Sequence, residues 1–229
     1  MRKIDPTIAK SETLLAFSEH FETEEDLELY CESISDEKER ELFLYVGSIY
    51  CAFVKHGDWH TTFEGRQTVV DYFTHSYKLV SLFSLIESLS GEKQIDFYQW
   101  LSAKSRRAIF PIKYCELETE YKNYKKLYGA NRKALEFFNS LPSDQRKKLI
   151  SGFTFGENET TIELIAKYLY NLRSQFVHNG QFILELGKGG HLDLDLEPSV
   201  TVWFDMRKLM DVFEVGVINH FSRENLKKV

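Results

Sequence analysis

The 229-residue sequence is poor in cysteine and proline and contains no long apolar run. Its three cysteines, Cys31, Cys51 and Cys115, are widely spaced, which excludes a CxxC metal motif and a disulfide framework. We therefore expect reduced thiols in a cytoplasmic protein. No charge-free stretch reaches the roughly 18 apolar residues of a membrane span. The first residues, MRKIDPTIAKSETLL, are too polar for a signal peptide.

Positive charge is not in excess either. The 29 lysines and arginines are outnumbered by 35 acidic residues, and the net charge is −6. The whole chain therefore does not attract nucleic acid, and RNA binding needs a local basic patch or a groove between subunits. Two stretches of the chain are locally basic. They are either solvated helix faces or a track that binds RNA. The residues are Lys122, Lys125, Lys126, Arg132 and Lys133, and then Arg146, Lys147 and Lys148.

Apolar residues are plentiful and follow the period of a helix. The hydrophobic share is 43% and the aromatic share 14%, enough for a substantial core. Spacings of three and four recur over residues 42–53, 68–89, 156–180 and 209–221, which indicates amphipathic helices. Because shorter helical patterns fill most of the chain between them, we predict a mostly α protein, a helical bundle.

Near the C-terminus the period changes to two. Apolar residues alternate with polar ones over Leu192–Leu196 and again over Val200–Phe204, and Gly187, Gly189 and Gly190 supply a turn. This pattern predicts a small antiparallel β-hairpin inserted before the last helix.

The stretch YNLRSQFVHNG, residues 170–180, places Arg173 and His178 at the end of an apolar helix. A histidine in the last turn has a structural explanation, because its cation interacts favourably with the exposed carbonyls. The alternative is a nuclease site, in which a guanidinium holds a phosphate and an imidazole moves a proton. Five helical residues separate the two directions by about 140°. The side chains would converge if the last turn loosens at Asn179-Gly180, or if a second subunit closes over the helix end.

The segment YLYNLRSQFVHNG resembles the Arg-x4-6-His signature of the HEPN superfamily. It is particularly similar to the Apea-like HEPN group, in which an Arg-Ser pair and a Val-His-Gly-like ending recur. The earlier segments YFTHSYKLVSLFSLIESL and NRKALEFFNSL resemble the first and middle core helices of that group. The resemblance covers roughly Thr68 to Phe221. We therefore divide the chain into an N-terminal helical extension, residues 1–60, packed on a HEPN-like helical domain, residues 61–229.

The resemblance implies a bundle that dimerises so that two motifs line one cleft. Active members cleave RNA without a metal or cofactor, in defence, toxin–antitoxin and RNA-processing systems. By position, Arg173 would bind the scissile phosphate and His178 would act as the general acid–base. Ser174 stands where active members often have Asn, Asp or His, and its hydroxyl can hydrogen-bond the substrate. Asn171 and Asn179 flank the motif as further substrate-binding candidates.

Three functions remain open from the sequence. The first is a metal-independent endoribonuclease, a homodimer with RNA as substrate and an antitoxin or regulatory protein as a further partner. The second is a non-catalytic module of the same shape that binds RNA or a nucleotide. The third is an interaction protein whose acidic N-terminal helices bind a partner protein. A metal site is not expected, since His56 and His60 in HGDWH have no third ligand nearby.

Overall fold

The computed structural model describes residues 4–90, 95–103, 112–187, 190–193 and 199–227. Most of these residues are helical, and a small antiparallel sheet precedes the last helix, so the predicted fold class is confirmed. Among the helices of the described residues, none is long and apolar enough to cross a bilayer.

The helices follow the apolar periods of the sequence. They are α1 (Pro6–Ala16), α2 (Glu24–Ser33), α3 (Glu37–Tyr50) with a π-helical turn at Cys51–Lys55, α4 (Gln67–Leu89), α5 (Phe97–Ser102), α6 (Tyr114–Tyr128), α7 (Ala130–Ser140), α8 (Ser143–Ser151), α9 (Ile162–Asn179) and α10 (Met206–Lys227). Side-chain caps fix several starts. The Asp36 carboxylate accepts the Lys38 N–H at 2.8 Å, for example, and satisfies one of the free donors of α3.

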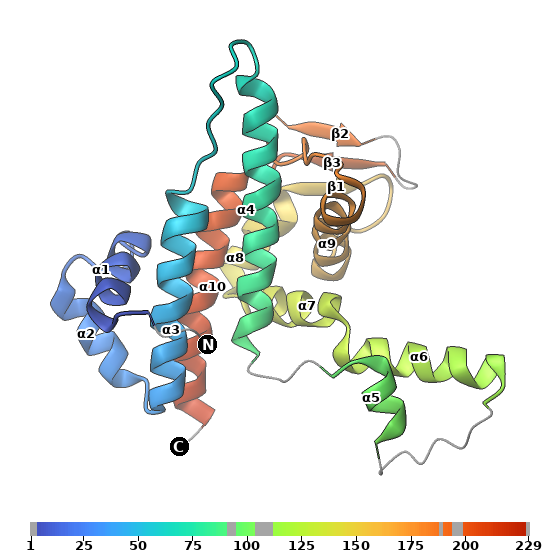
Figure 1. Cartoon of the computed structure of the whole chain (residues 1–229), viewed down its shortest axis with the longest axis horizontal. Coiled ribbons are helices and arrows are strands. Elements are labelled where there is room, and N and C mark those ends of the chain that lie inside the picture. Colours follow the sequence, from blue (N-terminus) through green and yellow to red (C-terminus); the bar gives the residue numbers. More distant parts are fainter. Residues whose placement is uncertain (1–3, 91–94, 104–111, 188–189, 194–198, 228–229) are drawn as a thin grey trace.

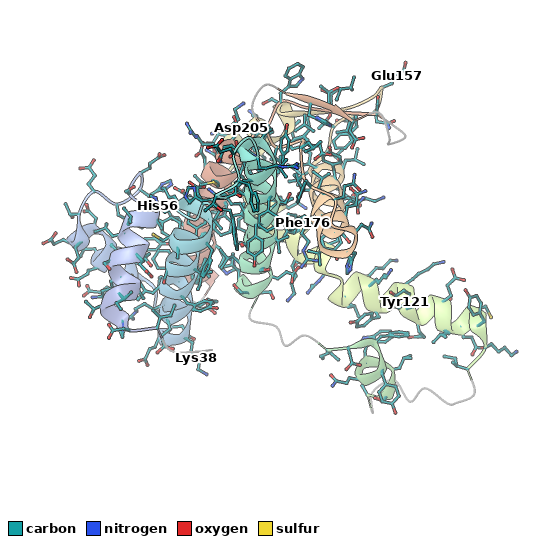
Figure 2. All side chains as sticks on the ribbon, turned by 45° about the horizontal axis from the view of Figure 1, so that its top comes forward. Lys38, His56, Tyr121, Glu157, Phe176 and Asp205 are labelled. Atoms are coloured by element: carbon teal, nitrogen blue, oxygen red, sulfur yellow. The ribbon has the colours of Figure 1, made fainter. Side chains whose placement is uncertain are left out.

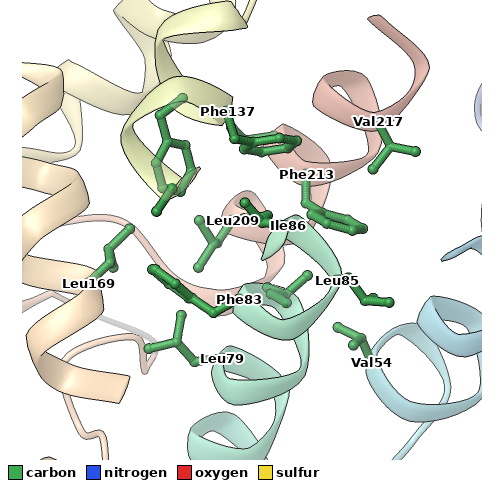
Figure 3. Packing of buried hydrophobic residues seen from close by; sticks show 14 of the residues in the cluster. Val54, Leu79, Phe83, Leu85, Ile86, Phe137, Leu169, Leu209, Phe213 and Val217 are labelled. Atoms are coloured by element: carbon green, nitrogen blue, oxygen red, sulfur yellow. The ribbon is translucent and has the colours of Figure 1, made fainter. Parts of the chain in front are cut away.

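Three long helices, α3, α4 and α10, run side by side through the middle of the molecule (Figure 1). Helices α1 and α2 cover one side, and α9 with the sheet covers the other. The hydrophobic core is continuous across these layers. Around α4 it brings Phe83 together with Leu169 of α9 and Phe213 of α10 (Figure 3). Each of these three side chains is nearly inaccessible to solvent, and burying one of this size contributes about 1.5–3 kcal/mol.

Helix α1 approaches α3 closely because Gly47 has no side chain. The Thr13 hydroxyl donates to the carbonyl oxygen of Leu44 at 3.1 Å, across the contact between the two helices. A methyl group on Gly47 would overlap the Thr13 side chain. Beyond this contact, the Phe17 ring stacks on Phe43 at 5.7 Å, and Phe43 meets Phe221 of α10 at 5.3 Å. The first helices therefore share the core of the last one.

A buried ionic cluster joins the same three parts of the chain. Glu214 of α10 is 3% exposed, and its carboxylate accepts a hydrogen bond from the Tyr50 hydroxyl at 2.6 Å. The Lys55 ammonium lies 3.1 Å from the same carboxylate and also donates to the Ala16 carbonyl. His20 Nε2 lies 3.6 Å from the other carboxylate oxygen. Burial, followed by the charge of Glu214, raises the pKa of Tyr50, so this hydroxyl stays protonated and donates.

The small sheet lies against the first half of α9. Its strands are β1 (Phe153–Phe155), β2 (His191–Asp193) and β3 (Val200–Val202), ordered β1-β3-β2 with both pairings antiparallel. Both phenylalanines of β1 pack edge-on against Tyr168 of α9. The pairing of β2 with β3 confirms the predicted hairpin, whereas β1 was not predicted.

The turn proposed for the hairpin is only partly described. Gly187 precedes the sheet, and residues 181–187 form no strand. Gly189 and the residues Leu194, Asp195 and Leu196 lie outside the described part of the chain.

Helices α5 and α6 project from the body as an arm that continues into α7 (Figures 1 and 2). The arm has its own aromatic cluster, in which Phe97 lies 5.1 Å from Tyr121 and 5.3 Å from Tyr124. The Tyr124 hydroxyl donates to the Ile95 carbonyl at 2.8 Å. The arm therefore packs largely on itself.

We predict that Glu214→Gln destabilises the protein through Lys55. The substitution removes the carboxylate charge and leaves a largely buried ammonium without its counter-charge, which lowers the free energy of unfolding by about 3 kcal/mol. Urea unfolding monitored by circular dichroism measures the change. Tyr50→Phe serves as the control, because it keeps the ion pair and removes one hydrogen bond, for a loss of about 1.5 kcal/mol. Equal stability of Glu214→Gln and the unmodified protein would contradict this account of the cluster.

Candidate functional site at the end of helix α9

Helix α9 is regular from its first residue to its last. The Thr161 hydroxyl accepts the Leu164 N–H at 3.2 Å and caps the start. At the other end, the Gly180 N–H donates to the Phe176 carbonyl at 3.0 Å, and Gly180 has a φ of 67°. The left-handed conformation suits glycine, so the predicted stop at Asn179-Gly180 is confirmed. The last turn does not loosen.

Three of the predicted site residues share one face of this helix. Asn171, Ser174 and His178 are three and four residues apart, so their side chains form a single strip along α9. The strip lies on the side away from the buried residues of the helix. Asn171 and His178 are exposed, and Ser174 is half-buried. Their hydrogen-bonding atoms are therefore accessible to a ligand from solvent.

Arg173 lies on a different side of the helix from His178. Five regular helical residues turn the chain by about 140° between them. The Arg173 guanidinium carbon is 5.8 Å from the centre of the Tyr170 ring, where the positive charge is attracted by the aromatic face. Its Nε is buried and has no hydrogen-bond partner. Within one chain, Arg173 and His178 therefore point apart, and Asn179 lies at the exposed helix end.

The end of α9 is held against α4 by an aromatic cluster. Phe73 of α4 is 5.9 Å from Phe176, 6.1 Å from Phe182 and 5.2 Å from Trp59. Just after the helix, the Ile183 N–H donates to Ser76 Oγ at 2.8 Å. Figure 2 shows Phe176 on the side of α9 that faces α4. These contacts fix the orientation of the helix that carries the motif.

A hollow of about 400 Å³ adjoins this end of α9. Its walls come from α3 and the π-helical turn, from the outer side of α4, and from Phe176 and Val177 of α9. Arg173 precedes Phe176 and Val177 by one helical turn, so it lies on the same side of α9 as these two residues. The sequence did not indicate this hollow, because residues from three distant segments form it.

The basic stretches and the HGDWH histidines are weaker candidates for a functional site than the motif on α9. Several cations of the basic stretches have acidic neighbours, with distances of 2.8 Å for Lys122–Glu118, 3.0 Å for Arg132–Glu136 and 3.4 Å for Lys148–Asp211. An RNA track along them stays a prediction. His56 and His60 are exposed. Across the described ranges, no three His, Cys, Asp or Glu side chains gather where they could hold a metal.

Two buried polar side chains, Tyr168 of α9 and Glu185 after the helix, form a second feature that the sequence did not reveal. Glu185 is 9% exposed and Tyr168 is 4% exposed, and each has a buried oxygen without a hydrogen-bond partner. Burial raises the pKa of Glu185. Burial, followed by the charge of Glu185, raises the pKa of Tyr168. Folding therefore favours the neutral form of the Glu185 carboxyl more than the unfolded chain does.

This burial predicts a pH-dependent stability. A carboxyl group whose pKa is raised by folding stabilises the fold fully below about pH 4.5 and loses that contribution as the pH rises through its folded value. Glu185→Gln removes this loss, so the variant is more stable than the unmodified protein by about 1 kcal/mol at pH 7.5. Urea midpoints between pH 4.5 and pH 8 measure the difference. Glu157→Gln, at an exposed position, is the control, and parallel curves for Glu185→Gln and the unmodified protein would refute the prediction.

Comparison of the chain with protein-family models, curated proteins and solved structures finds no match. The resemblance to the HEPN superfamily therefore rests on the residues quoted for it and stays a prediction. These residues lie in α4, α7 and α9, three helices that contact one another.

Proposed function

We propose that this chain is a HEPN-like, metal-independent endoribonuclease that acts as a homodimer in the cytoplasm. The observation that carries the proposal is the position of the motif. His178 is exposed in the last turn of a bundle helix, and Arg173 lies one turn from an open hollow. The three cysteines of the chain are free thiols, which suits a reducing compartment. Involvement in defence or a toxin–antitoxin pair, with an antitoxin or regulatory protein as partner, is part of the proposal.

The chemistry needs only the two side chains of the motif. His178 takes the proton of the ribose 2′-hydroxyl as that oxygen attacks phosphorus. The bond from phosphorus to the 5′-oxygen breaks, and this oxygen leaves with a proton from water. The products are a 2′,3′-cyclic phosphate and a 5′-hydroxyl end, and the imidazolium returns its proton to solvent. Arg173 binds the phosphate oxygens and stabilises the charge that develops on them. Asn171, Ser174 and Asn179 hydrogen-bond the RNA near this point.

The geometry of α9 supports the proposed dimer. Because the helix stays regular, the two motif side chains of one chain diverge by about 140°. A second copy placed over the helix end brings its own His178 to the Arg173 of the first. Each complete site would then combine residues of both subunits.

A non-catalytic module that binds RNA or a nucleotide is the second candidate. Ser174 favours it, because this position in the motif carries a hydroxyl where active members of the HEPN superfamily often have Asn, Asp or His. In this case Arg173 would hold a phosphate and no bond would break. An interaction protein whose acidic N-terminal helices bind a partner is the third candidate, and it remains if the unmodified protein neither cleaves nor binds RNA.

We predict that Arg173→Ala and His178→Ala each abolish RNA cleavage without unfolding the protein. Loss of the acid–base group lowers the rate by about 100- to 10,000-fold. The melting temperature should change by only a few degrees, because His178 is exposed and Arg173 is half-buried. Gel analysis of a labelled single-stranded RNA, with and without EDTA, measures cleavage, and EDTA should leave it unchanged.

The matched controls are His56→Ala and Arg207→Ala, both at exposed positions outside α9. They should cleave RNA at the unmodified rate. Inhibition by EDTA would count against the metal-independent mechanism. RNA binding that depends on Arg173, with no cleavage by the unmodified protein, would favour the binding module. Unfolding of both motif variants would show that Arg173 and His178 stabilise the fold and are not a catalytic pair.

A further inference from the structure

We infer that the hollow between α3, α4 and α9 binds one unpaired base of the RNA whose phosphate lies at Arg173. The inference rests on the proposed RNA function and adds a binding site for one base beside the motif. The volume, about 400 Å³, falls within the range of about 300–1,000 Å³ that is usual for small-molecule sites.

The lining of the hollow suits a neutral, planar heterocycle. All of its side chains are uncharged, and the aromatic residues Tyr45, Phe53, Tyr77 and Phe176 contribute to it. Phe53 is 55% exposed and Tyr77 is 40% exposed, so their rings are open to a ligand. A base that stacks on an exposed aromatic ring gains about 1–3 kcal/mol in single-stranded complexes. Paired bases cannot reach such rings, because the neighbouring bases cover their faces.

Serines on α4 provide room and polar contacts. Ser81, Ser84 and Ser88 line the hollow, and their short side chains leave the space that larger residues would fill. Ser84 Oγ donates to the Val80 carbonyl at 3.0 Å, and Ser88 Oγ donates to the Leu85 carbonyl at 2.6 Å. With their protons engaged, these oxygens still accept hydrogen bonds. The N–H groups on the edge of a nucleobase are the matching donors.

The π-helical turn explains how Phe53 reaches this surface. Across Cys51–Lys55 the chain has an extra residue per turn, and such turns are frequent at functional sites. Cys51 and Val54 are buried there, while Phe53 is exposed into the hollow. The Lys55 ammonium is anchored by Glu214 and by the Ala16 carbonyl. The buried cluster therefore holds the turn that presents the ring.

The positive charge of Arg173 beside the hollow favours a nucleotide, rather than a second copy of this chain, as the ligand of the hollow. The hollow itself carries no charge, but Arg173 lies one helical turn from Phe176 and Val177 at its edge. An uncharged aromatic hollow beside a guanidinium complements a neutral base joined to an anionic phosphate. The base would lie in the hollow and its phosphate at Arg173, within reach of the proposed site.

The test measures binding separately from cleavage. The probe is a fluorescein-labelled ten-residue RNA with a 2′-O-methyl group at every position, which cannot be cleaved through the 2′-oxygen. Fluorescence anisotropy gives its dissociation constant for the full chain. Phe53→Ala removes one aromatic face, and Ser84→Leu fills the hollow. Each should weaken binding by about 5- to 100-fold, the range expected for one stacked base. The same sequence as a duplex should bind more weakly than the single strand.

The controls match each variant in type and exposure. Phe63→Ala removes a ring that is 77% exposed and does not line the hollow. Ser33→Leu replaces an exposed serine whose hydroxyl also donates to its own helix, at the Tyr30 carbonyl. Both should bind the probe as the unmodified chain does.

Two results would overturn the inference. One is unchanged binding of the probe by Phe53→Ala and Ser84→Leu, and if the motif variants still lose cleavage, the proposed nuclease survives this failure. The other is a shift of Phe53→Ala or Ser84→Leu from dimer to monomer in sedimentation, with unchanged binding per chain. That shift would assign the hollow to a second copy.

Discussion

The uninterrupted course of α9 is the constraint on which the candidate site depends. Each residue of a regular helix turns by about 100°, and this helix stays regular up to the hydrogen bond from Gly180 to Phe176. One side, with Leu169, Leu172 and Phe176, packs on the body. That packing leaves Ser174 and His178 facing outward and places Arg173 at the edge. For this reason the proposed nuclease is a homodimer that combines Arg173 of one chain with His178 of the other.

The N-terminal helices contribute more than a cover for the core. They lie outside the resemblance to the HEPN superfamily, yet α3 and its π-helical turn form one wall of the hollow beside the motif. The position of this wall depends on Glu214 of α10, which binds Lys55 and Tyr50. In the proposed function, one buried carboxylate therefore links the stability of the fold to the binding of the RNA base. In the proposed function, the first part of the chain shapes the surface that receives the RNA base.

Local patterns predicted much of the fold, and long-range packing decided the rest. The helix over Gln67–Leu89 and the stop at Gly180 follow from apolar periods and a glycine, both visible in the sequence. The strand Phe153–Phe155 was missed because three residues are too few to show a period. Residues 181–187 form no strand, and the Ile183 N–H donates to Ser76 Oγ of α4. The motif could be located on its helix from the sequence. The hollow could not, because Phe53, Ser84 and Val177 meet only after three helices pack.

The most direct test of the proposed composite site is complementation between two inactive chains. Arg173→Ala keeps His178, and His178→Ala keeps Arg173, so a mixed dimer contains one site with both side chains only if the site spans two subunits. Subunit exchange, verified by native mass spectrometry, is followed by a cleavage assay on single-stranded RNA. We predict that the mixture regains cleavage that neither variant shows alone. A mixture that forms mixed dimers and stays inactive, beside an active unmodified protein, would contradict the composite site.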